Sequence, residues 1–98
     1  DATEEDAVAA GLHEITTLIN TGSDAPGTIL SFCSSEFNTI FQEAPIIIAK
    51  GQANYETLSE VGENVFCLLQ VKCPTIARDI GAPVGNLIVC QSTRAINL

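Results

Sequence analysis

The sequence contains no methionine and no tryptophan, and it has only four lysines and arginines among 98 residues. Against 12 aspartates and glutamates, this leaves a formal net charge of −8. A nucleic acid or an anionic lipid surface would need a basic footprint, so neither is expected as a partner. No apolar run approaches the roughly 20 residues of a membrane span, and no segment has the layout of a signal peptide. Since Asp1 stands where an initiator methionine would be, we expect a processed product or a piece of a longer chain.

Apolar residues are abundant, at 46% of the chain, with a mean hydropathy of +0.28. This composition excludes a disordered acidic tail. A chain of this length allows one domain and no more, and it buries roughly two-thirds of its unfolded surface, which is enough for one modest core.

Four cysteines, at positions 33, 67, 73 and 90, permit a disulfide framework with three possible pairings. Cys67 and Cys90 lie within apolar runs, however, and such settings are typical of buried cysteines in strands. No Cys-x-x-Cys spacing is present, which disfavours a zinc site. These features predict a reduced chain in the cytoplasm.

The first helix is expected to begin at Thr3, whose hydroxyl precedes three acidic residues and forms a capping box with Asp6. Apolar residues then recur at helical spacing as far as about Asn20, at Val8, Leu12, Ile15 and Ile19. Further helices are expected at residues 34–45, 55–60 and 74–80. Short apolar runs predict buried strands at residues 46–49, 64–71 and 86–91.

Alternating apolar strands and helices predict an α/β fold with parallel strands. Three parallel strands make a narrow sheet that needs cover on both faces. The chain is therefore expected to be the C-terminal half of a Rossmann-like, three-layer domain, with a mostly parallel sheet and helices on both faces. We expect an N-terminal part of that domain to be missing from residues 1–98.

One polar cluster follows the first predicted strand, at the position where open α/β sheets bind ligands. Lys50 offers a charge suited to phosphate, and Gly51 allows close backbone approach. Asn54 can donate and accept hydrogen bonds, while Glu56 can accept them or coordinate a cation. The alternative is an ordinary loop in which Lys50 is solvated and Asn54 caps a short helix.

Asp1 is the second candidate, because a strand preceding it would place its carboxylate at a strand tip. A carboxylate there is a natural ligand for Mg²⁺ or Mn²⁺. The alternative is that the acidic residues near Asp1 only complement the dipole of the first helix. No P-loop and no Gly-x-Ser-x-Gly sequence is present.

The sequence IIIAKGQANYETLSE, at residues 46–60, resembles a signature of the DUF89 family. Residues 64–77, NVFCLLQVKCPTIA, are similar to the next family segment, and DATEEDA at residues 1–7 resembles the opening of the family's C-terminal half. The likeness spans nearly the whole chain and is strongest to the prokaryotic branch. Members of this family are described as ARMT1-like, metal-dependent damage-control phosphatases.

The resemblance implies a metal-dependent phosphatase acting on phosphomonoesters of small metabolites, such as sugar phosphates or damaged phosphometabolites. It implies a divalent cation (Mg, Mn, Co or Ni) with Asp1 as one metal ligand. Lys50 and Asn54 would be catalytic. Lys50, Gly51, Asn54 and Glu56 would bind the substrate.

This sequence has no Asp-Asn dipeptide, although an Asp-Asn pair supplies further metal ligands in the family. We therefore expect residues 1–98 to be inactive alone and to need the N-terminal remainder of the domain. Two alternatives stay open at this point. One is a non-catalytic fragment or a subunit that needs a partner chain, and the other is a carboxyl methyltransferase, which would need an adenosyl-binding loop.

Overall fold

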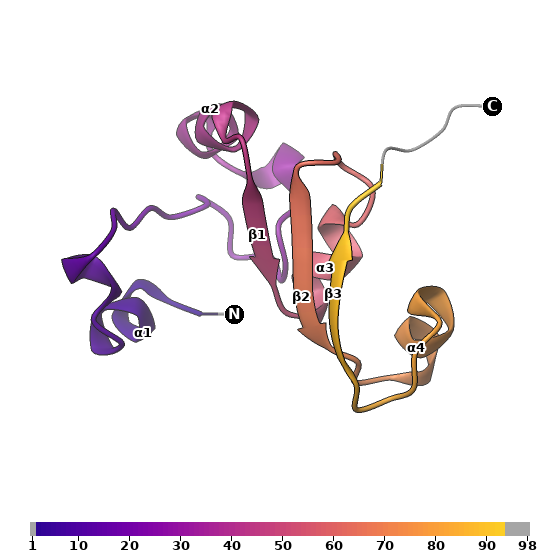
Figure 1. The fold of residues 1–98 in the computed structure, drawn as a ribbon. Coiled ribbons are helices and arrows are strands. Elements are labelled where there is room, and N and C mark those ends of the chain that lie inside the picture. The colour runs from indigo at the N-terminus through magenta and orange to yellow at the C-terminus, as the bar shows by residue number, and fades with distance from the viewer. Residues whose placement is uncertain (1, 94–98) are drawn as a thin grey trace.

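The structure, a computed structural model, describes residues 2–93. Helices and strands follow one another in the order α1 (Glu4–Ala9), α2 (Ser35–Glu43), β1 (Ile47–Lys50), α3 (Gln52–Leu58), β2 (Val65–Gln70), α4 (Pro74–Ile80) and β3 (Leu87–Gln91). Two short 3₁₀ turns, Leu12–Glu14 and Leu30–Phe32, precede α2. Figure 1 shows a three-stranded sheet, with α3 packed behind it. The predicted α/β class is confirmed, and its later elements lie close to their predicted positions.

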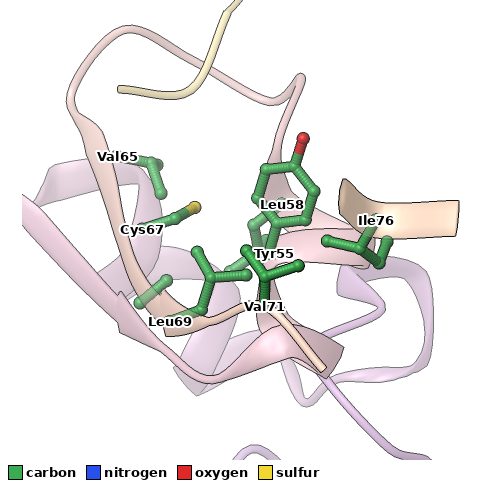
Figure 2. Close-up of a cluster of buried hydrophobic side chains, with 8 residues drawn as sticks. Tyr55, Leu58, Val65, Cys67, Leu69, Val71 and Ile76 are labelled. Carbon is green, nitrogen blue, oxygen red and sulfur yellow. The ribbon is translucent and has the colours of Figure 1, made fainter. Parts of the chain in front are cut away.

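The core lies on one face of the sheet only. β2 alternates along its length, so that Val65, Cys67 and Leu69 are buried while their neighbours are less so. Tyr55 and Leu58 of α3 pack against this buried face. Figure 2 shows these side chains together with Val71 and Ile76. The alternating burial along β2 gives the sheet one apolar face, and α3 packs on that face. The loop between β1 and α3 therefore lies next to the centre of the sheet.

The three-stranded sheet of the described residues is mixed, and the expectation of a mostly parallel sheet is not confirmed by it. β1 and β2 are parallel, but β3 runs antiparallel to β2, with Cys67 opposite Cys90. The amide of Val71 donates to the carbonyl of Asn86, and the amide of Gly85 donates to the carbonyl of Val71. The chain therefore leaves β2, forms α4 and returns to the same end of β2. The segment with α4 is thus a helical connection between antiparallel strands and not a crossover between parallel ones.

A three-layer arrangement with helices on both faces is not seen in residues 2–93. α3 contacts β1 and β2 from one side, and the apolar core residues lie on that side. In Figure 1 the face toward the viewer carries no helix of the described chain. The described part is therefore a sheet with one covered face.

The first helix is much shorter than predicted. The expected capping box at Thr3 is confirmed: the Asp6 amide donates to Thr3 Oγ1, and the Thr3 amide donates to Asp6 Oδ2. These hydrogen bonds lower the pKa of the Asp6 carboxyl. α1 nevertheless ends at Ala9, and Gly11 adopts φ +80°. The apolar stripe that predicted a helix to Asn20 stays largely exposed, at 44% for Val8 and 81% for Ile15. A short helix is stabilised mainly by burial of such a stripe, so the helix stops where no burial is available.

All four cysteines of the chain carry free thiols in the structure. Cys67 is fully buried, as predicted, and Cys90 is half-buried. Burial raises the pKa of both thiols, which makes them less reactive. Within residues 2–93, no helix has the length and apolar character needed to cross a bilayer.

Candidate functional site

The candidate site is built around Gly51, where β1 ends and α3 begins. The Gly51 amide donates to the Leu68 carbonyl of β2, and the Gly51 carbonyl accepts from the Tyr55 amide. Its φ of +95° is a conformation that side-chain-bearing residues rarely adopt. A Cβ placed on Gly51 would meet no atom within 4 Å. The backbone is thus open on this side, as the sequence predicted.

The two lysines of the chain follow the carboxyl ends of two neighbouring strands, on the same side of the sheet. Lys50 ends β1, and Lys72 lies two residues after the end of the parallel strand β2. The Lys72 amide donates to Gln52 Oε1 at 3.1 Å, which joins the loop after β2 to the start of α3. In a chain of net charge −8, both lysines therefore follow the carboxyl ends of adjacent parallel strands, and Lys50 of the two lines the cavity described below.

Asn54 is held in place from two sides. Its Nδ2 donates to the Lys50 carbonyl at 2.9 Å, and its Oδ1 accepts from Thr28 Oγ1 at 2.8 Å. Thr28 is 8% exposed, and its amide donates to Thr57 Oγ1 at 2.9 Å. These bonds leave one hydrogen on Nδ2 and one lone pair on Oδ1 for a ligand. The side-chain amide of Asn54 is thus oriented by the protein.

A cavity of about 300 Å³ opens beside these residues. Its polar part is formed by Lys50, Asn54 and Thr28. Its apolar wall comes from α2, the approach to β1, β1 itself and α3, namely Phe37, Ile40, Phe41, Ala44, Ile46, Ile47, Ile48, Ala49 and Leu58. A polar end beside an apolar wall is the usual character of a pocket for a small organic ligand.

The structure brings together only some of the predicted site residues. Lys50, Gly51 and Asn54 lie at one strand end, but only Lys50 and Asn54 line the cavity. Glu56 is exposed on α3 and, like Gly51, does not line it. Asp1, the predicted metal ligand, lies outside the described residues. Within residues 2–93, no group of three His, Cys, Asp or Glu side chains could hold a metal ion. The described residues do not form a metal centre by themselves.

Sequence reasoning missed two residues of this region, Thr28 and Gln52. Thr28 contacts Asn54 across 26 positions of sequence, and Gln52 contacts Lys72 across 20. Thr28 belongs to no periodic pattern or spaced motif. Gln52 stands inside the polar cluster after the first strand, but nothing in the sequence indicates its contact with Lys72. Contacts over such separations arise from the fold, so only the tertiary structure could identify them.

Tyr55 lies directly behind the site, 8% exposed, and its hydroxyl donates a hydrogen bond to Asp79 Oδ2 of α4. Burial, followed by the bond to Asp79 and the charge of that carboxylate, raises the pKa of Tyr55 well above its ordinary value of 10.0. This bond ties α4 to α3. It therefore fixes the excursion between β2 and β3 relative to the helix that carries Asn54.

Tyr55 is the only tyrosine, so the absorbance of tyrosinate reports on this residue alone. We expect the folded chain to release the phenol proton only well above pH 10, while the unfolded chain releases it near 10.0. The stabilisation is then complete below pH 10 and is lost as the pH rises above it. Tyr55→Phe should abolish this alkaline loss and cost about 1 kcal/mol at neutral pH. Asp79→Asn is the control, which keeps an acceptor and should lower the titration midpoint. A folded-state midpoint near 10.0 would contradict the assignment.

Comparison with known proteins places this chain within a family. A family model described as "Damage-control phosphatase ARMT1-like domain" matches residues 1–88. A damage-control phosphatase of Pyrococcus horikoshii is 46% identical over 93 residues, which is 94% of this chain and 32% of that protein. A damage-control phosphatase of Archaeoglobus fulgidus is 41% identical over 90 residues, 90% of this chain and 31% of that protein. An uncharacterised protein of Methanocaldococcus jannaschii is 44% identical over 95 residues, 93% of this chain and 31% of that protein.

The fold agrees with these sequence matches. The crystal structure of a DUF89 family protein from Pyrococcus horikoshii superposes with a TM-score of 0.87 at 44% identity, covering 95% of this chain and 33% of that one. The chain belongs to the ARMT1-like (DUF89) damage-control phosphatase domain family. It spans about a third of the length of the relatives it matches. At the level of the family, the associated activity is that of a phosphatase.

Proposed function

We propose that this chain supplies the phosphate-binding part of a metal-dependent phosphatase that hydrolyses phosphomonoesters of small metabolites, such as sugar phosphates or damaged phosphometabolites. The observation that carries the proposal is the sheet edge where Lys50 and Lys72 follow parallel strands beside the open backbone of Gly51. An acidic chain would otherwise repel a phosphate ester. The names of the relatives from Pyrococcus and Archaeoglobus support the same reaction class.

In this proposal Lys50, Gly51, Asn54, Glu56 and the apolar wall of the cavity each have a separate role. The Lys50 ammonium group lies next to the phosphoryl group and offsets the negative charge that shifts during transfer. The Gly51 backbone permits close approach, and Asn54 uses its remaining hydrogen and lone pair to orient the ester. The apolar wall excludes water from the organic part of the substrate. Glu56, by family resemblance, contacts the substrate from the exposed side of α3.

Residues 2–93 do not supply the set of ligands that the proposed metal ion needs. A divalent cation (Mg, Mn, Co or Ni) would be held by Asp1 together with ligands from outside this chain. The proposed partner is therefore the polypeptide that corresponds to the remaining two-thirds of the relatives, and the isolated chain should be inactive. A reducing compartment such as the cytoplasm suits the four free cysteines.

A chimera tests this proposal. This chain replaces the matching third of the Pyrococcus damage-control phosphatase, and phosphate release is measured from a panel of small phosphomonoesters with Mg, Mn, Co or Ni. We expect turnover that disappears on exhaustive chelation and returns with added metal, and none from the isolated chain. Activity that survives chelation would rule out the metal dependence. A folded chimera that releases no phosphate, or that transfers methyl groups instead, would overturn the reaction class.

A further inference from the structure

Two thiols face each other across the antiparallel strands β2 and β3. Cys67 of β2 lies directly opposite Cys90 of β3. Opposite residues of a ladder carry their side chains on the same face of the sheet, and both thiols pack in the core. Cys67 is fully buried and Cys90 is half-buried, and Figure 2 shows the Cys67 side chain pointing into the core. The two thiols also hydrogen-bond to each other. The fold therefore brings into contact two thiols that lie far apart in the sequence.

The spacing of the two strands at this position suits a disulfide. The Ser92 amide donates to the Val65 carbonyl, and hydrogen-bonded pairs alternate along an antiparallel ladder. Cys67 and Cys90, two positions further along, therefore form a hydrogen-bonded pair, with Cα atoms about 5.5 Å apart as in a typical disulfide. Their Cβ atoms need to approach each other by roughly 1 Å for the bond to form. Within residues 2–93, β3 pairs only with β2, which leaves it free to make this approach.

We propose that Cys67 and Cys90 form a reversible disulfide across β2 and β3 when the protein meets a low-molecular-weight disulfide. The Cys90 thiolate attacks one sulfur of this reagent, which forms a mixed disulfide and releases one small thiol. The Cys67 thiolate then attacks the Cys90 sulfur and expels the second small thiol. Two protein thiols are thereby oxidised to one disulfide, and the reagent is reduced to two thiols that take up the two protons.

Cys90 is assigned as the attacking thiol because it is the more exposed of the two. Burial raises the pKa of both thiols, but the hydrogen bond between them raises the pKa of Cys67 and lowers that of Cys90. The Cys67 thiol thus donates to the Cys90 sulfur and stabilises its thiolate. Cys67 needs no access to solvent, since its own attack takes place inside the protein. The raised pKa values make the exchange slow, so both thiols stay reduced until the reagent is in excess.

The disulfide would attach β3 covalently to the strand that supports the candidate site. The Leu68 carbonyl, one residue after Cys67, accepts the Gly51 amide at 2.8 Å. Closing a loop of roughly 20 residues stabilises the folded chain against unfolding. The approach that the bond requires makes it easier to reduce than a relaxed disulfide, so it is reversible. Oxidation would therefore stabilise the sheet, and reduction would return it to its original state.

The test treats the 98-residue chain, and the chimera that carries it, with an excess of oxidised glutathione and maps the products by mass spectrometry. We expect the peptide that links Cys67 to Cys90 to predominate over every other linked pair. The melting temperature of the chain should rise by roughly 10 °C and fall again on addition of dithiothreitol. In urea, where the chain is unfolded, Cys67 should pair mainly with Cys73, because the shortest loop costs the least entropy.

Variants of the other cysteines supply the controls. Cys33→Ala and Cys73→Ala should keep both the linked peptide and the rise in melting temperature, because neither thiol lies opposite a cysteine in the described sheet. Cys90→Ala, at the half-buried position, should lose both. The proposal is overturned if the linked peptide does not form without urea, if the same pairs form with and without urea, or if Cys90→Ala shows an equal rise. None of these readouts depends on phosphate release.

Discussion

Replacing Lys50 by alanine in the chimera should reduce the rate of phosphate release by roughly a hundredfold, the usual scale for one electrostatic contact to a reacting group. Lys50 ends β1 with an exposed side chain that reaches the cavity beside Asn54. Nothing else in the polar part of the cavity carries a positive charge, since its other members are Asn54 and Thr28. The loss should therefore appear in the rate and leave the melting temperature within a few degrees.

Arg78→Ala is the control for this prediction. Arg78 is an exposed cation on α4 and does not line the cavity, so its removal changes the net charge by the same amount. Rates should stay within about twofold, because an exposed charge away from the site is largely screened. Full activity in Lys50→Ala, or an equal loss in both variants, would contradict the role given to Lys50.

Gly27→Ala should be the most destabilising small substitution near the site, at about 3 kcal/mol in urea unfolding. Gly27 adopts φ +73°, and an added Cβ would lie 2.6 Å from the Ala53 carbonyl oxygen and 3.0 Å from Thr57 Oγ1. Part of the cost is the left-handed conformation, about 1–2 kcal/mol, and the rest is displacement of the loop from α3. That loop carries Thr28, so Asn54 should lose its partner as well.

Gly81→Ala separates these two contributions. Gly81 ends α4 at φ +78°, nearly the same conformation, but its added Cβ would meet no atom within 4 Å. Its cost should therefore be about 1 kcal/mol, from the conformation alone. If the two variants lose the same free energy of unfolding, the close approach of the loop to α3 is not what makes glycine necessary at position 27.

The candidate site was only partly predictable. Lys50, Gly51 and Asn54 stand close together in sequence directly after an apolar run, so the strand-end rule locates them. Thr28 orients Asn54 from a position far away in the sequence, and Gln52 accepts a hydrogen bond from the Lys72 amide 20 positions away. Nothing local in the sequence indicates either contact. The roles of Asp1 and Glu56 remain predictions from family resemblance.

Local patterns in the sequence determined the short elements of this protein. Ser34 Oγ accepts a hydrogen bond from the Phe37 amide at the start of α2, and Pro74 and Gly81 delimit α4, because caps and backbone limits act within one turn.

The tertiary structure alone decided the direction of β3 and the length of the first helix. Both the strand direction and the helix length depend on which other parts of the protein the strand or helix can pack against. Within residues 2–93 the stripe from Val8 to Ile19 stays largely exposed, and β3 pairs with the free edge of β2 after α4. Periodicity describes an element's own faces but carries no information about what lies opposite them.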